Sequence, residues 1–163
     1  MKKFFGVLGG LALCAAAALA QAQSSSSAPP AKTIAEPQAG FVKSVRGNVQ
    51  LLSAAGTSRT AAAGDALAAV DRIVTGPDSS ASVVLRDDTT LMIGPSSRLD
   101  LKEFHFNSTT HDGGVLVSLL RGSMRMITGL IGKTNPDAIR VETQTATIGI
   151  RGTDFIVQAD GQP

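Results

Sequence analysis

Cysteine and the large aromatic residues are nearly absent from this sequence. Its 163 residues include one cysteine, Cys14, six phenylalanines, and no tryptophan or tyrosine. Because Cys14 lies in a predicted leader that is removed, the mature chain has no disulfide, redox pair or thiol nucleophile. The lack of tryptophan and tyrosine removes the usual aromatic platforms for sugars and single-stranded nucleic acid.

An excess of charge of either sign is also missing. The full chain has 15 lysines and arginines against 13 acidic residues. Removal of Lys2 and Lys3 with the leader leaves 13 against 13, and the remaining basic residues are spread singly. This balance argues against nucleic acid as a partner, since nucleic-acid-binding domains carry a basic patch or stripe.

The first residues have the layout of a secretory signal peptide. Lys2 and Lys3 precede an uncharged stretch, 4–20, that is rich in alanine, leucine and glycine. Small residues then stand at the spacing of a cleavage site before Gln21 or before Gln23. We therefore predict that residues 1–22 are a signal peptide and that the protein is periplasmic or secreted.

Two alternatives to cleavage fit this leader less well. A membrane anchor needs about 20 strongly apolar residues, whereas this stretch is shorter and rich in the weakly apolar alanine. A lipoprotein would attach its lipid at Cys14, but the preceding residue is the bulky Leu13 where a small residue is expected. We expect the membrane to be met only transiently, through the signal peptide.

The rest of the chain divides into a linker and one folded domain. Residues 23–39 are rich in serine, proline and alanine, a composition typical of a flexible linker. Residues 40–160 form a stretch of about 120 residues, which is the ordinary size of one domain with an adequate core. We predict a single domain there.

Alternation of apolar and polar residues predicts that this domain is all-β. The segment 139–145 alternates clearly, and β-rich runs on either side of Arg86, Asp87 and Asp88 predict a hairpin. The absence of a strand–helix–strand rhythm argues against a doubly wound enzyme fold. Residues 115–131 fit either a helix face or two strands with a turn near Arg121 and Gly122, and we favour the strands.

Four segments, in order, resemble the FecR domain family, and together they span nearly the whole predicted domain: 40–49, 64–76, 81–99 and 145–155. The last has the form of the family's closing signature, an Ala-Thr-x-Gly-x-Arg-Gly-Thr-x-Phe pattern. The resemblance implies a periplasmic domain of short antiparallel strands and hairpins, arranged as a β-roll or solenoid. In this chain Asp88 stands where the family often has glycine, and Gln144 stands near a common proline.

The resemblance does not by itself imply signalling. The founding members carry a cytoplasmic anti-sigma segment before a membrane helix, and their periplasmic domain senses a transporter. Here the N-terminus is itself the predicted signal peptide, so we expect a standalone domain without that segment.

The family signature supplies the residues of greatest interest, Gly149, Arg151, Gly152, Thr153 and Phe155. Glycine within a strand usually marks a bulge or a close approach of two backbones. We predict a structural role, in which a buried or half-buried Arg151 pins two strand segments by hydrogen bonds. The alternative is that the signature recognises a partner.

Other candidate sites are weaker, and we predict no catalytic, cofactor or metal site. His105, His111 and Asp112 lack the spacing of a known metal site. Asp87 and Asp88 are adjacent in a predicted turn, so their side chains should diverge.

Two short patterns also carry little weight. The segment 132–134, Gly-Lys-Thr, lacks the earlier glycine of a nucleotide-binding loop, since Ile127 stands there. The segment 107–109, Asn-Ser-Thr, matches a glycosylation sequon only formally.

Three functions remain open from the sequence. The first, which we favour, is a non-enzymatic module that binds a protein or envelope partner through β edges and loops. The second is a sensory accessory of a membrane regulator of the TonB-receptor and sigma-factor type. The third is an envelope hydrolase with an unrecognised site.

The leader generates a direct prediction. We expect the exported protein to begin at Gln21 or Gln23, because the small residues that the signal peptidase requires precede each of them. Intact-mass measurement of the exported protein tests this. A lipid-modified Cys14 at the N-terminus, or a mass that still includes Met1, would contradict it.

Overall fold

The structure is a computed structural model that describes residues 38–161. The predicted signal peptide lies outside the described residues, as does all of the predicted linker except its last two residues. Those two residues already belong to the first strand, which begins at Gln38. Among the described residues, no helix is both long and apolar enough to span a membrane.

Strands make up most of the domain, as the alternation predicts. The elements in chain order are β1 (Gln38–Arg46), β2 (Val49–Leu52), β3 (Ser58–Thr60), β4 (Ala66–Ala68), β5 (Arg72–Thr75), β6 (Ser80–Leu85), β7 (Thr90–Ile93), β8 (Arg98–Phe106), β9 (Gly113–Ile127), α1 (Leu130–Thr134), a 3-10 turn (Pro136–Ala138), β10 (Ile139–Thr143), β11 (Thr147–Gly149) and β12 (Asp154–Ala159). The all-β prediction is therefore confirmed.

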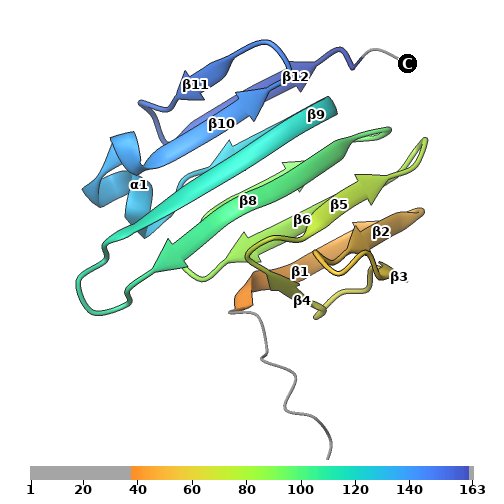
Figure 1. The fold of residues 1–163 in the computed structure, drawn as a ribbon, viewed down its shortest axis with the longest axis horizontal. Coiled ribbons are helices and arrows are strands. Elements are labelled where there is room, and N and C mark those ends of the chain that lie inside the picture. Colours follow the sequence, from red (N-terminus) through yellow and green to blue (C-terminus); the bar gives the residue numbers. More distant parts are fainter. Residues whose placement is uncertain (1–37, 162–163) are drawn as a thin grey trace, which may run out of the picture. The chain divides into compact units, whose positions relative to one another are not determined.

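The long strand β9 belongs to both layers of the sheet. Its first half pairs with β8 and β10, and its second half pairs with β7 and β12. One layer thus has the order β3-β2-β5-β8-β9-β10-β11, and the other has β4-β1-β6-β7-β9-β12. Figure 1 shows β9 running diagonally beside β8, with β10, β11 and β12 beyond it.

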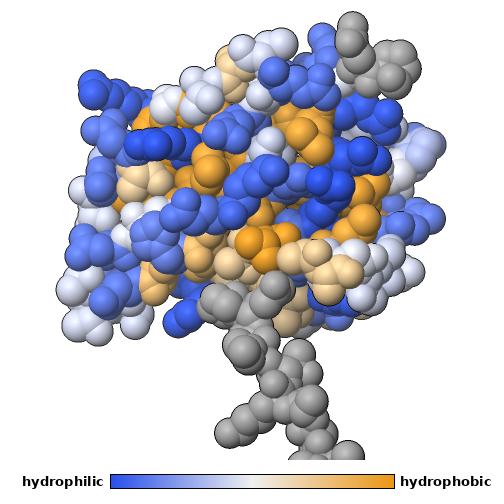
Figure 2. Space-filling view, viewed as in Figure 1, coloured by the Kyte–Doolittle hydropathy of each residue, from blue (hydrophilic) through white to orange (hydrophobic). Residues whose placement is uncertain are grey.

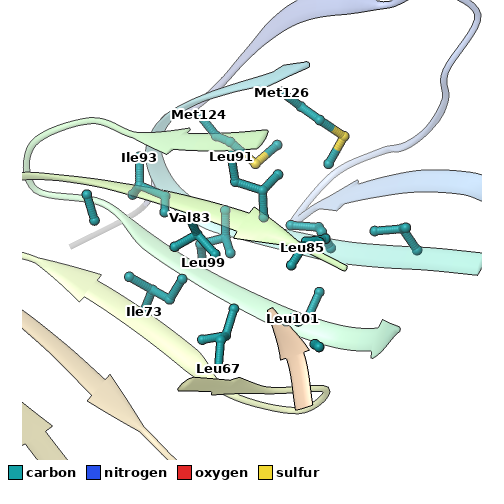
Figure 3. Packing of buried hydrophobic residues seen from close by; sticks show 14 of the residues in the cluster. Leu67, Ile73, Val83, Leu85, Leu91, Ile93, Leu99, Leu101, Met124 and Met126 are labelled. Atoms are coloured by element: carbon teal, nitrogen blue, oxygen red, sulfur yellow. The ribbon is translucent and has the colours of Figure 1, made fainter. Parts of the chain in front are cut away.

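The core lies between these two layers. Because side chains alternate along a strand, every second residue points inward. Leu85, Leu91 and Met126 come from one layer, and Ile73 and Leu101 come from the other (Figure 3). All five are at most 1% exposed. Burial of each such side chain contributes about 1.5–3 kcal/mol relative to leaving it in water.

The outer surface of the β5–β8 layer is largely polar. The Arg72 guanidinium donates two hydrogen bonds to the Asp100 carboxylate, at 2.5 and 2.7 Å, across the β5–β8 pair. On the face in Figure 2, hydrophilic side chains interrupt the apolar ones. This surface therefore needs no further covering layer.

The segment 115–131 is neither a helix nor two strands. Strand β9 runs without reversal through Arg121 and Gly122, so the turn predicted there is wrong, although the preference for β structure is confirmed. Gly122 has a φ of 92°, which bends the strand from one layer into the other. A Cβ at Gly122 would lie 2.1 Å from Ser97 Oγ, so the bend is packed closely against the turn before β8.

Two turns of similar sequence each use a buried serine hydroxyl in the same way. Ser79 Oγ follows Asp78 and accepts a hydrogen bond from Asn48 N–H at 2.9 Å. Ser97 Oγ follows Ser96 and accepts one from Ser123 N–H at 3.0 Å. Both hydroxyls are buried, and the residue before each has positive φ, 56° and 50°. The hydroxyls therefore satisfy partly buried N–H groups on neighbouring segments.

The hairpin turn at Asp87 and Asp88 repeats this arrangement. Thr89 Oγ1 donates to Asp87 Oδ2 at 2.6 Å and accepts from Gly129 N–H at 2.9 Å, while Asp87 O accepts from Leu130 N–H at 2.7 Å. Asp88 takes the left-handed conformation, φ 66°, in the place of the family's glycine. Asp87 is fully buried and Asp88 is exposed, so the two carboxylates diverge as predicted.

Gly129→Ala should be strongly destabilising. A Cβ at Gly129 would lie 1.9 Å from Asp87 O and 2.4 Å from Thr89 N, both backbone atoms that cannot move aside cheaply. We expect a loss of about 1–3 kcal/mol in the free energy of unfolding, measured by urea denaturation. Gly149→Ala is the matched control, because a Cβ there meets no atom within 4 Å. Equal stability of the two variants would show that the 87–89 turn does not hold residues 128–130.

Candidate protein-binding edge

The family signature forms the crossing from one layer to the other. It runs from β11 through residues 150–153 into β12. Ile150, 6% exposed, anchors the crossing in the core, and Phe155 is half-buried against it. The carbonyl of Thr153 accepts a hydrogen bond from Thr128 N–H at 2.9 Å. An apolar side chain and the backbone therefore hold the crossing.

Arg151 does not pin two strands, contrary to the prediction. Its side chain is exposed, and within residues 38–161 it forms no hydrogen bond or ion pair. Thr153 is also exposed, and a Cβ at Gly149 or at Gly152 would meet no atom within 4 Å. The prediction failed because Ile150 takes the buried position and turns Arg151 toward solvent. These four signature residues thus present a free surface.

Strand β12 is paired on one side only among the described residues. Its partner is β9, from Asp154 opposite Ile127 to Ala159 opposite Gly122. Since Thr153 O points toward β9, alternation directs the backbone N–H and C=O groups of Asp154, Ile156 and Gln158 away from it.

The outer face of this edge strand is apolar at its centre. Ile156 is 72% exposed, while its neighbour Val157 is buried. The residues 155–157, Phe-Ile-Val, are the only sequence signal of this edge: three consecutive apolar residues in a strand place one of them on the outer face. Which edge is left open could not be inferred from them.

An exposed ion pair fixes the start of β12 to β9. Arg125 donates to both carboxylate oxygens of Asp154, at 2.9 and 2.5 Å. The hydrogen bonds from Arg125, with its positive charge, hold the pKa of Asp154 below the ordinary aspartate value. The same contact raises the pKa of Arg125.

A groove lies at the other end of β12, beside the β10–β11 turn. It has a volume of about 580 Å³ and is lined by Leu120, by residues 143–145 and by residues 158–160. Gln144 closes its floor by donating from Nε2 to the carbonyl of Leu120 at 3.0 Å. The open edge therefore continues into a concave, mostly polar channel.

The structure does not bring the candidate metal ligands together. His105 Nδ1 lies 3.2 Å from Glu103 Oε1, whereas His111 stacks on Phe106 with ring centroids 6.4 Å apart. Over residues 38–161 no group of three acidic, histidine or cysteine side chains could hold a metal ion.

The two short patterns have local structural roles. Asn107 of the sequon lies in the exposed β8–β9 loop, where its side-chain oxygen accepts from Thr109 N–H at 2.9 Å. Residues 132–134 belong to the short helix α1. The N–H groups of Gly129 and Leu130, which a phosphate at this helix would need, are already bonded to Thr89 and Asp87.

The Arg125–Asp154 pair predicts a titration. Because folding lowers the pKa of Asp154, the pair's stabilisation is present above the unfolded-state pKa and is lost as pH falls through the folded-state pKa. We expect the NMR titration midpoint of the Asp154 carboxyl to lie below the ordinary aspartate value, and Arg125→Gln to raise it. Arg46→Gln on β1 is the control and should leave it unchanged. An Asp154 titration midpoint that does not change in Arg125→Gln would contradict the pairing.

The match to a family model supports the identification drawn from the signature. One solved structure, a "Cell surface anchoring domain", is 26% identical, with a TM-score of 0.39, and the match covers 40% of this chain and 86% of that one. No curated protein sequence matches this chain. The family model described as "FecR protein" matches residues 71–163, which is more than half of the sequence. The chain therefore belongs to the FecR family.

Proposed function

We propose that this protein is a non-enzymatic module of the cell envelope that binds a partner protein through the signature crossing and β12. The carrying observation is that Arg151, Gly152 and Thr153 are exposed, and that the side chains of Arg151 and Thr153 form no hydrogen bond or ion pair in the described domain. The fold is held there by Ile150 and by backbone hydrogen bonds instead. Exposed signature residues whose side chains have no packing role, Arg151 and Thr153, are best explained by recognition.

The predicted compartment is consistent with this function. FecR domains are typically periplasmic, and the leader has the layout of a signal peptide. The balance of acidic and basic residues that remains without the leader suits a partner bound through a limited edge rather than through a large charged face. Contact by way of backbone groups and one arginine would leave the rest of the surface free.

Signal transmission is a second use of such a module, favoured by the family assignment. A sensory accessory would bind a membrane regulator or receptor through the same edge. A sigma factor or TonB-type receptor gene beside this one would favour that use. No observation favours an envelope hydrolase.

Arg151→Ala should separate binding from folding. Because the side chain is exposed and forms no hydrogen bond or ion pair in the described domain, we expect the free energy of unfolding to change by no more than about 0.5 kcal/mol. A photo-crosslinker at Thr153 should capture a periplasmic protein, and Arg151→Ala should abolish that capture. A crosslinker at Lys43, exposed on β1, is the control. Loss of stability together with capture would restore the structural role of Arg151, and equal capture from both positions would refute a specific edge.

A further inference from the structure

Resting on the proposed function, we propose that β12 binds the extended C-terminal segment of a partner protein as an added antiparallel strand, with the partner's terminal carboxylate at Arg151. This assigns a partner chemistry and a direction to the edge. Three observations carry it: the open backbone edge, the unequal width of the two layers, and the free arginine at the strand's start.

The open edge offers the pairing groups. Asp154, Ile156 and Gln158 direct their backbone N–H and C=O groups away from β9, and no other described strand pairs with them. A strand laid along this edge gains main-chain hydrogen bonds, as in other complexes formed by strand addition. An apolar side chain of that strand beside Ile156 would cover a residue that is 72% exposed.

The two layers differ in width by one strand beyond β9. Beyond β9, one layer continues with β10 and then β11, whereas the other continues with β12 alone. The inner side chain of β11, Ile148, pairs across from the buried Val141 and is itself only partly covered. A strand added to β12 would lie opposite β11 and could cover Ile148. The groove at residues 158–160 continues this space at the far end of β12.

The same overhang disfavours a second copy of this protein as the occupant. If two copies paired edge to edge through β12, the other layer of each copy would extend past the junction. Strand β10 of one copy would then occupy the position of β11 of the other copy, and the two would clash. A single extended segment has no such second layer. The occupant is therefore a tail of a partner rather than an edge of this domain.

The charge at the start of β12 sets the direction of the tail. In an antiparallel pair the C-terminus of the added strand lies beside the N-terminal end of β12, next to residues 149–153. Arg151 is exposed there, and the guanidinium binds carboxylates in a bidentate manner. Gly149 and Gly152 have open space where a Cβ would stand, so a carboxylate can approach the backbone. The Asp154 carboxylate at this end is already paired with Arg125, whereas the exposed Asp160 at the other end has no ion pair in the described domain and would disfavour the reverse direction.

Peptide binding to the full mature protein tests this inference. The probe is a fluorescent peptide of alternating threonine and valine, about seven residues long to match a strand, with a free C-terminal carboxylate. We expect saturable binding of this peptide, and binding weakened about tenfold or more when the C-terminus is amidated, since a charge-assisted contact is lost. N-methylation of the peptide at the alternate positions that face β12 should abolish binding.

Variants of the protein place the peptide on the edge. Arg151→Ala should weaken the carboxylate peptide to the level of the amide and leave the amide peptide unchanged. Arg46→Ala, an exposed arginine on β1, should alter neither. Hydrogen exchange of the Ile156 and Gln158 amides should slow when the peptide binds.

Three outcomes would overturn the inference: equal binding of carboxylate and amide, insensitivity to N-methylation, or unchanged exchange along β12. Each differs from a failure of the proposed function. If the crosslinker at Thr153 captures a partner while the peptide does not bind, the module is correct and the strand-addition mode is wrong. If neither occurs, the edge is not a binding surface.

Discussion

A buried hydroxyl that follows a left-handed residue holds the bends of this sheet at three places. Ser79, Ser97 and Thr89 each accept a hydrogen bond from a backbone N–H of a neighbouring segment. The preceding residue has positive φ in each case, at a cost of about 1–2 kcal/mol outside glycine. Loss of the Thr89 hydroxyl would leave the buried Gly129 N–H unpaired, at about 1–3 kcal/mol, and loss of either serine hydroxyl would leave a partly buried N–H unpaired.

The third of these turns also positions the family signature. Thr89 and Asp87 bind the N–H groups of Gly129 and Leu130, and the adjacent Thr128 donates its own N–H to Thr153 O. The hairpin segment and the closing signature, far apart in the sequence, therefore meet at residues 128–130. Because the signature contributes a backbone carbonyl to this junction, the side chains of Arg151 and Thr153 are free to face outward.

Local pattern predicted the strands, the Asp88 turn and the family, but not how the strands combine. The alternation in residues 139–143 gave β10 directly, and positive φ at Asp88 follows from the tolerance of aspartate for that conformation. The local sequence around Gly122 predicted a turn, whereas the structure has a bend within one strand. That bend packs against Ser97, which is distant in the sequence, so no local pattern could indicate it. The exposure of Arg151 likewise depends on Ile150 reaching the core, which no local signal specifies.

The edge strands of the sheet differ in length, and β12 is the longest of them. Short edge strands resist unwanted pairing, and β3, β4 and β11 each have three residues. Strand β12 has six, without lysine, proline or a bulge, and it exposes Ile156. The domain thus keeps its other edge strands short and retains one longer edge strand with an exposed apolar residue at its centre. Strand β12 directly follows the exposed Arg151 and the glycines Gly149 and Gly152, which have open space around them. These residues restrict the strands that pair with β12 to those that end in a carboxylate.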